Sequence, residues 1–96
     1  MSLLSGIKLG NRNLPNRIAI NAMECCDADT DGNPRETAFR RYERLARGNA
    51  GAIIIEALSV VDENKGRAHQ LTALPQNQKG LTDLVAAMRK ANPKPA

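Results

Sequence analysis

Three aspartates spaced two residues apart are the first candidates for chemistry in this sequence. In the stretch DADTDG, Asp27, Asp29 and Asp31 take positions 1, 3 and 5 of a calcium loop, and a glycine takes the sharp-turn position 6. Position 12, where a bidentate glutamate closes the coordination sphere, is Ala38, and a strand-like run precedes the first aspartate where an entering helix is needed. A turn whose carboxylates precede a helix N-terminus accounts for the same residues, so we expect that turn and no metal site.

Two neighbouring cysteines and a single histidine are the candidates for nucleophilic or redox chemistry. Cys25 and Cys26 follow the apolar run, whereas His69 lies far along the chain in a polar stretch. A reactive thiol needs a base or a cationic setting, so a Cys25/His69 pair is one interpretation. The alternative is that a cysteine fills apolar space and that His69 lies on a loop surface.

Glu56 is a further candidate because it ends an apolar, β-branched run. A carboxylate at such a place must find a partner or a cofactor. A structural ion pair with an arginine and a functional role both remain open from the sequence.

Composition bounds the kind of protein. The chain has 96 residues, is 42% hydrophobic and carries a net charge of +4, which suits one small domain. The basic residues are scattered and the only aromatic residues are Phe39 and Tyr42, so we expect no nucleic-acid partner. Two adjacent cysteines form no disulfide framework, and no apolar run has secretory or membrane-spanning length; we therefore expect a cytoplasmic protein without a membrane partner.

The best-marked element that could position these residues is a helix at residues 34–47. Asn33 can cap it, Pro34 suits its first position, and Glu36 stands in the capping-box place. Strands are indicated by short β-branched runs, the second of them uninterrupted, as in a strand covered on both faces. We predict a hairpin at residues 7–17, strands at 17–23 and 51–58, a long polar loop at 61–76 and a second helix at 79–91.

Strands that alternate with helices predict an α/β fold with a parallel sheet. Two β/α units leave both sheet edges unpaired, so the pattern is typical of the opening of a larger structure, the N-terminal portion of a TIM (β/α)8 barrel preceded by a β-hairpin. In such a barrel the carboxyl ends of the strands, residues 21–24 and 56–58, lie on the face that carries the active site.

The segments GIKLGNRNLPNRIAINAM and DTDGNPRETAFRRYERLARGNAGAIIIEALSV, in this order, resemble the N-terminal quarter of the Old Yellow Enzyme family of flavin-dependent ene reductases. The resemblance implies a TIM barrel that holds FMN, reduction of the flavin by NAD(P)H, and hydride transfer to an activated alkene such as an enone or enoyl thioester. Carried over by position, it implies that Ala22, Met23, Glu24 and Ala57 line the flavin ring. Glu24 departs from the family, which usually has threonine, cysteine or histidine there.

The family's other substrate and phosphate residues would lie beyond Ala96, so the resemblance implies that this chain alone is not a competent reductase. We expect the remainder of the barrel or a second chain as partner, a small-molecule substrate for the complete enzyme, and a homo-oligomer if the piece exists alone. The alternative is a small non-enzymatic β/α domain that binds a partner through its sheet edges and apolar helix faces.

Overall fold

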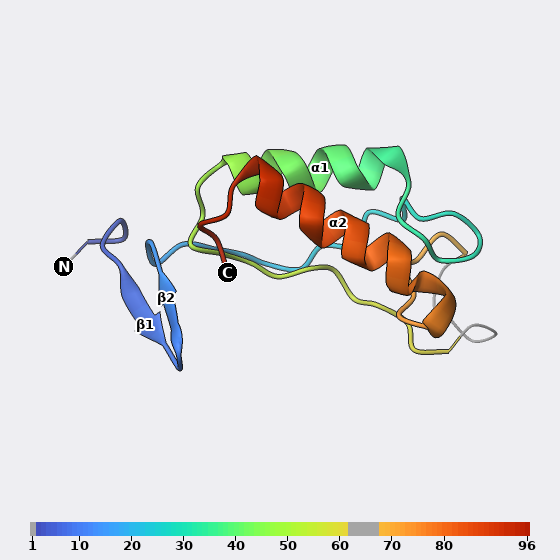
Figure 1. Cartoon of the computed structure of the whole chain (residues 1–96), viewed down its shortest axis with the longest axis horizontal. Helices are drawn as coiled ribbons and strands as arrows, with labels where there is room; N and C mark the ends of the chain where they lie inside the picture. Colours follow the sequence, from blue (N-terminus) through green and yellow to red (C-terminus); the bar gives the residue numbers. More distant parts are fainter. Residues whose placement is uncertain (1, 62–67) are drawn as a thin grey trace.

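Two short β-sheets and two packed α-helices make up residues 2–61 and 68–96, the part of the chain that the computed structural model describes. The molecule measures 47 × 22 × 21 Å, and its radius of gyration of 14.3 Å exceeds the value of about 12.5 Å expected for a compact domain of this length. The excess comes from the hairpin, which lies at one end of the long axis, apart from the helices (Figure 1).

The hairpin is the first element along the chain. Strand β1 (Ile7–Leu9) pairs antiparallel with β2 (Arg12–Leu14), and Leu9 lies opposite Arg12. Gly10 makes the turn with a φ of +59°, a left-handed conformation that glycine adopts without a steric penalty. The predicted hairpin is therefore present, but it ends at Leu14 and not at residue 17.

A parallel strand pair follows the hairpin. Strand β3 (Ala19–Ile20) lies beside β4 (Ala52–Ile53), with Ala19 opposite Ala52. Both strands are shorter than the predictions of 17–23 and 51–58: the paired residues are Ala19 with Ala52 and Ile20 with Ile53 only. The prediction that the second strand is covered on both faces is wrong: Ile54 is 52% exposed, since no described element packs over that face.

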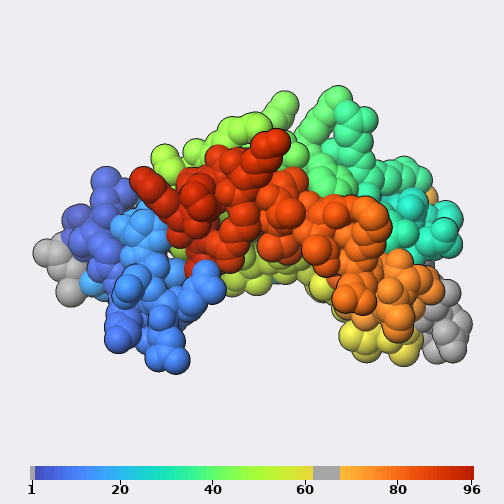
Figure 2. All heavy atoms as spheres, viewed as in Figure 1, coloured from blue at the N-terminus to red at the C-terminus, as the bar shows by residue number. Residues whose placement is uncertain are grey.

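The two helices pack against each other on one side of the β3–β4 pair (Figure 1). Helix α1 (Glu36–Arg47) buries one stripe of side chains and α2 (Gln78–Ala91), which follows the short 3-10 turn η1 (Pro75–Asn77), buries Leu84 against it. Figure 2 shows α2 crossing the visible face of the molecule. The buried apolar residues are Ala28, Ala38, Tyr42, Ala46, Ala50, Leu71 and Leu84.

Helix α1 begins two residues later than predicted, and the predicted capping box is wrong. Arg35 is the N-cap residue and makes no side-chain cap. Pro34 is held in an antiparallel bridge to Ala28, and the N–H of Arg35 donates to the carbonyl of Asp27 at 3.2 Å. The Asn33 side chain instead accepts a hydrogen bond from Asn77 at 2.9 Å. Tertiary bonds have replaced the local cap.

The long polar loop predicted at 61–76 lies partly outside the described residues, which omit 62–67. Its described part is ordered by bonds to the strand ends: Thr72 forms a parallel bridge with Ser59, and η1 leads into α2. Neither α1 nor α2, nor any other helix among the described residues, has the length and apolar character needed to cross a membrane.

Candidate functional site

The site implied by the resemblance lies where the chain leaves β3 and β4. Ala22, Met23 and Glu24 follow β3, Ala57 follows β4, and all four residues are exposed. Parallel strands bring their carboxyl ends to one edge, so these segments meet there. Glu24 and Ala57 are joined through a third residue, because the Gln70 side chain forms hydrogen bonds with both.

Gln70 is a site residue that the sequence analysis missed. Its side-chain nitrogen donates to the Glu24 carboxylate at 3.1 Å and to the Ala57 carbonyl oxygen at 3.4 Å. The residue itself is only 9% exposed. Nothing in the spacing of the sequence points to it, since 46 residues separate it from Glu24 and only the return of the chain after the polar loop brings the two together.

Glu56, which precedes Ala57 in the sequence, is the most deeply buried charged residue in the described chain, at 2% exposure. One of its carboxylate oxygens accepts hydrogen bonds from Arg41 at 2.6 Å and from the Tyr42 hydroxyl at 2.8 Å. The same hydroxyl accepts the backbone N–H of Glu56 at 3.0 Å. The ion-pair interpretation of Glu56 is therefore confirmed, and the arginine is Arg41.

Arg41 connects the two loops that follow the strands. Besides Glu56, its guanidinium bonds both oxygens of Asp27 at 3.2 Å and lies 4.4 Å from the centre of the Tyr42 ring. Asp27 belongs to the loop after β3, whereas Glu56 belongs to the segment after β4. One side chain from α1 thus holds both strand ends in place.

Burial and these bonds shift two pKa values. Burial works against the charge of Arg41, but the hydrogen bonds to Glu56 and Tyr42 and the nearby charge of Asp27 together outweigh it, so the pKa of the guanidinium is raised. Burial also raises the pKa of the Tyr42 phenol above its ordinary value of 10.0. Both groups therefore keep their protons throughout the physiological range, and the cluster stays intact there.

Tyr42 supplies a direct test of this cluster, because it is the sole tyrosine of the chain. We expect its phenolate absorbance to appear at higher pH in the folded chain than in the urea-unfolded chain. A pKa raised by folding contributes stability that is complete below about pH 10 and is lost as pH rises through the folded-state pKa. Tyr42→Phe removes this part of the alkaline loss of stability. Identical titration curves for the two states would contradict the burial of the hydroxyl.

The aspartates predicted to form a turn do so. One Asp29 oxygen accepts the backbone N–H groups of Asp31 at 2.9 Å and of Asn33 at 3.0 Å, which closes the loop before α1. Asp27 is paired with Arg41. Within residues 2–61 and 68–96, no group of three histidine, cysteine or acidic side chains could hold a metal ion.

The cysteines and the histidine have different partners. His69 uses Nδ1 to bond the carbonyl oxygen of Ala28 at 2.9 Å, and since a carbonyl only accepts, Nδ1 carries the hydrogen. Cys25 is exposed, with its sulfur 3.8 Å from the carbonyl oxygen of Met23, and Cys26 is half-buried with a φ of +53°. No contact in the described chain joins Cys25 to His69, so the structure gives no support to that nucleophile pair.

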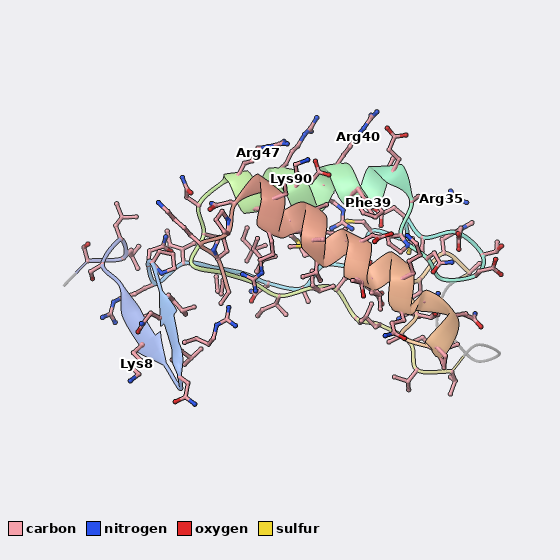
Figure 3. The ribbon with its side chains drawn as sticks, viewed as in Figure 1. Lys8, Arg35, Phe39, Arg40, Arg47 and Lys90 are labelled. Carbon is pink, nitrogen blue, oxygen red and sulfur yellow. The ribbon has the colours of Figure 1, made fainter. Side chains whose placement is uncertain are left out.

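The outer face of α1 is basic and solvated. Arg40 and Arg47 point away from the rest of the chain (Figure 3), and each pairs with a glutamate one turn earlier on the same helix. Exposed pairs of this kind contribute little to stability. This agrees with the interpretation of the positive charge as scattered surface charge.

Two β/α units with their carboxyl ends at one edge define a segment of a β/α barrel, and solved structures identify the kind of barrel. The chain is similar to the Old Yellow Enzyme from Trypanosoma cruzi, at 32% identity and a TM-score of 0.80 over 92% of this chain and 24% of that one. It is also similar to the Old Yellow Enzyme homologue from Zymomonas mobilis, at 25% identity and a TM-score of 0.82 over 95% and 25%.

A 2-naphthoyl-CoA reductase shares the fold, with a TM-score of 0.86 at 24% identity over 93% of this chain and 14% of that one. The resemblance to the Old Yellow Enzyme family is thus confirmed over nearly the whole chain, which spans about a quarter of the length of the first two structures. The barrel itself is not present in the described residues, so the fold-class prediction is confirmed only for the segment. No family model and no curated protein matches the sequence.

Proposed function

We propose that this chain forms the first two β/α units of an FMN-dependent oxidoreductase that passes hydride from NAD(P)H to an activated alkene, either an enone or an enoyl thioester. The observation that carries the proposal is the joint contact of Gln70 with Glu24 and Ala57, which brings the two flavin-lining segments together at one edge. The 32% identity to an Old Yellow Enzyme over 92% of the chain supports it.

The residues present fit a flavin edge. Ala22 and Ala57 are exposed, and each side chain is a single methyl group, so a planar ring can approach the backbone there. Met23 is 59% exposed and offers a flexible apolar contact. FMN supplies the hydride chemistry when bound. The chain binds and orients one edge of the ring, and Glu24 presents a carboxylate to it.

Glu24 gives the site its own character. An ionised carboxylate beside the ring disfavours negative charge on the reduced flavin and lowers its potential. We therefore infer that Glu24 tunes the flavin, and Glu24→Gln tests this role. A raised flavin potential in the variant supports the role, and an unchanged potential removes it.

We further propose that the partner of this chain is the remainder of the barrel, supplied by more polypeptide or by a second chain, and that it joins at the edge of β4 opposite β3. Two hydrogen bonds of 2.9 Å support this, from Ala96 N–H to the Gly51 carbonyl and from Ile53 N–H to the Ala96 carbonyl. They have the staggered pattern of a parallel ladder. The peptide at Ala96 therefore lies where a third strand begins.

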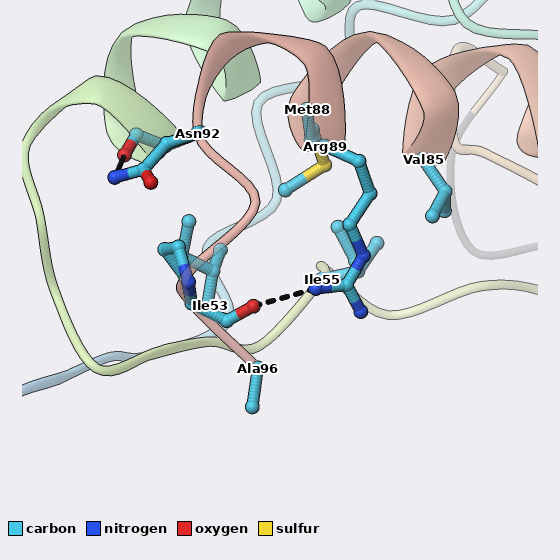
Figure 4. A pocket seen from close by; sticks show the side chains of 9 residues that line it. Ile53, Ile55, Val85, Met88, Arg89, Asn92 and Ala96 are labelled. Carbon is cyan, nitrogen blue, oxygen red and sulfur yellow. Dashed lines mark hydrogen bonds between the residues drawn. The ribbon is translucent and has the colours of Figure 1, made fainter. Parts of the chain in front are cut away.

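An apolar cavity of about 160 Å³ lies beside that edge (Figure 4). Ile53, Ile55, Val85 and Met88 line it, together with Arg89, which donates to the Pro95 carbonyl at 2.7 Å. Side chains of an added strand would fill it. The alternative function, a non-enzymatic interaction domain, uses the same edge for an unrelated partner, and the exposure of Ile54 is the observation in its favour.

Visible absorption of the purified protein, recorded before and after denaturation, separates the two functions. We expect flavin bands that are released on unfolding, in a sizing fraction larger than the 10.4 kDa of one chain, because the ring needs the rest of the barrel. A colourless sample that elutes as a monomer would overturn both the reductase and the assembly proposals. A colourless oligomer would overturn the reductase and favour the interaction domain.

A further inference from the structure

The chain that returns from the polar loop joins both strand ends, and Gln70 lies in its middle. The carbonyl of His69 accepts the N–H of Ala28 at 3.1 Å, on the side of β3. The carbonyl of Leu71 accepts the N–H of Ser59 at 3.0 Å, on the side of β4. The backbone on either side of Gln70 is therefore fixed to one loop and then to the other.

This backbone leaves the Gln70 side chain little freedom. The residue is 9% exposed, whereas Glu24, which it contacts, is exposed. A primary amide carries two N–H groups on one nitrogen, so it can serve the Glu24 carboxylate and the Ala57 carbonyl together. The Ala57 carbonyl can only accept hydrogen bonds, and the Glu24 carboxylate can only accept them when it is ionised. Neither a carboxylate nor an aliphatic side chain at position 70 can make these two bonds.

We propose that Gln70 is a positioning residue: from its buried place it holds the exposed Glu24 carboxylate beside the Ala57 carbonyl, and so fixes where that negative charge stands at the flavin edge. The part of this inference that concerns flavin rests on the proposed function. The bond itself does not. Gln70 touches no reacting atom in this scheme, and its effect passes through Glu24.

The first experiment uses the 96-residue chain without flavin. Hydrogen exchange of the Gln70 side-chain amide is followed by NMR in the wild type and in Glu24→Ala, a change at an exposed position that leaves the core intact. We expect the amide to exchange about tenfold faster in Glu24→Ala, because the variant loses a hydrogen bond to a charged acceptor. Equal exchange rates in the two proteins would overturn the proposal.

The second experiment uses the flavin-loaded protein and measures the flavin potential in a double-mutant cycle. Gln70→Leu and Gln70→Asn, which is one methylene too short, should each shift the potential in the wild-type background and have no further effect in Glu24→Ala. Gln78→Glu, at the exposed start of α2, is the control and should leave the potential unchanged.

A shift of equal size in both backgrounds would overturn the proposal, because Gln70 would then act without Glu24. The two experiments fail separately. Faster exchange in a protein that never holds flavin would sink the proposed function and leave the bond standing. A flavoprotein in which the cycle shows no coupling would sink the positioning role alone.

Discussion

Replacing Arg41 by methionine will destabilise the folded chain by about 3 kcal/mol. The variant leaves the Glu56 carboxylate, whose side chain is 1% exposed, with the Tyr42 hydroxyl and no cation. Breaking a buried ion pair on one side costs about 3–5 kcal/mol. The lower end applies because the Arg41 side chain is 24% exposed, so water can reach part of the space it leaves. Urea unfolding followed by the helical circular dichroism signal measures the loss.

The neighbouring residue provides the matched control. Arg40→Met removes an arginine from the same helix turn, but its pair with Glu36 is exposed, with side-chain exposures of 69% and 76%. We expect a change within about 0.5 kcal/mol. The double variant Arg41→Met/Glu56→Gln should be more stable than Arg41→Met alone, because it removes the isolated charge as well. Equal losses for Arg41→Met and Arg40→Met would contradict the proposed importance of the buried cluster.

The sequence predicted local structure well where local rules decide it. Gly10 between two alternating runs gives the hairpin turn, and the apolar spacing on α1 gives the helix stripe that buries Tyr42. The start of α1 could not be predicted in the same way. Asn33 has the chemistry of a cap, but Asn77, 44 residues later, takes its side chain. A local preference worth about 1 kcal/mol yields to such tertiary contacts.

The candidate site also contains some residues that the sequence predicted and others that only tertiary contacts determine. Ala22, Met23, Glu24 and Ala57 came from the resemblance, and the structure brings the ends that carry them to one edge. The need of Glu56 for a partner followed from its place after an apolar run, since a buried carboxylate requires one. Which arginine it finds, and that Gln70 enters the site, depend on how the chain returns from the polar loop. No periodicity or spacing encodes that return.

Gly32→Ala is the second large effect that we expect, with a loss of about 3 kcal/mol of folding stability. Gly32 has a φ of +85°, which costs a residue with a Cβ about 1–2 kcal/mol. The added Cβ would also lie 2.0 Å from the Thr72 hydroxyl oxygen and 2.8 Å from its Cβ. Thr72 is fully buried, and its hydroxyl is bonded to Asn77, so it cannot move aside without further losses. Overpacking of this kind costs about 1–3 kcal/mol more.

Gly10→Ala isolates the first of these two costs, because Gly10 also has a positive φ of +59° but no atom lies within 4 Å of its added Cβ. We expect Gly10→Ala to lose only about 1–2 kcal/mol in the same urea unfolding measurement. Equal losses of stability at the two glycines would show that Thr72 moves aside without cost.

The difference between the two variants matters for the site, because Thr72 lies two residues from Gln70 and its N–H donates to the Gly32 carbonyl at 3.1 Å. A displaced Thr72 would carry Gln70 with it, so Gly32→Ala should also speed hydrogen exchange of the Gln70 side-chain amide, whereas Gly10→Ala should leave it unchanged.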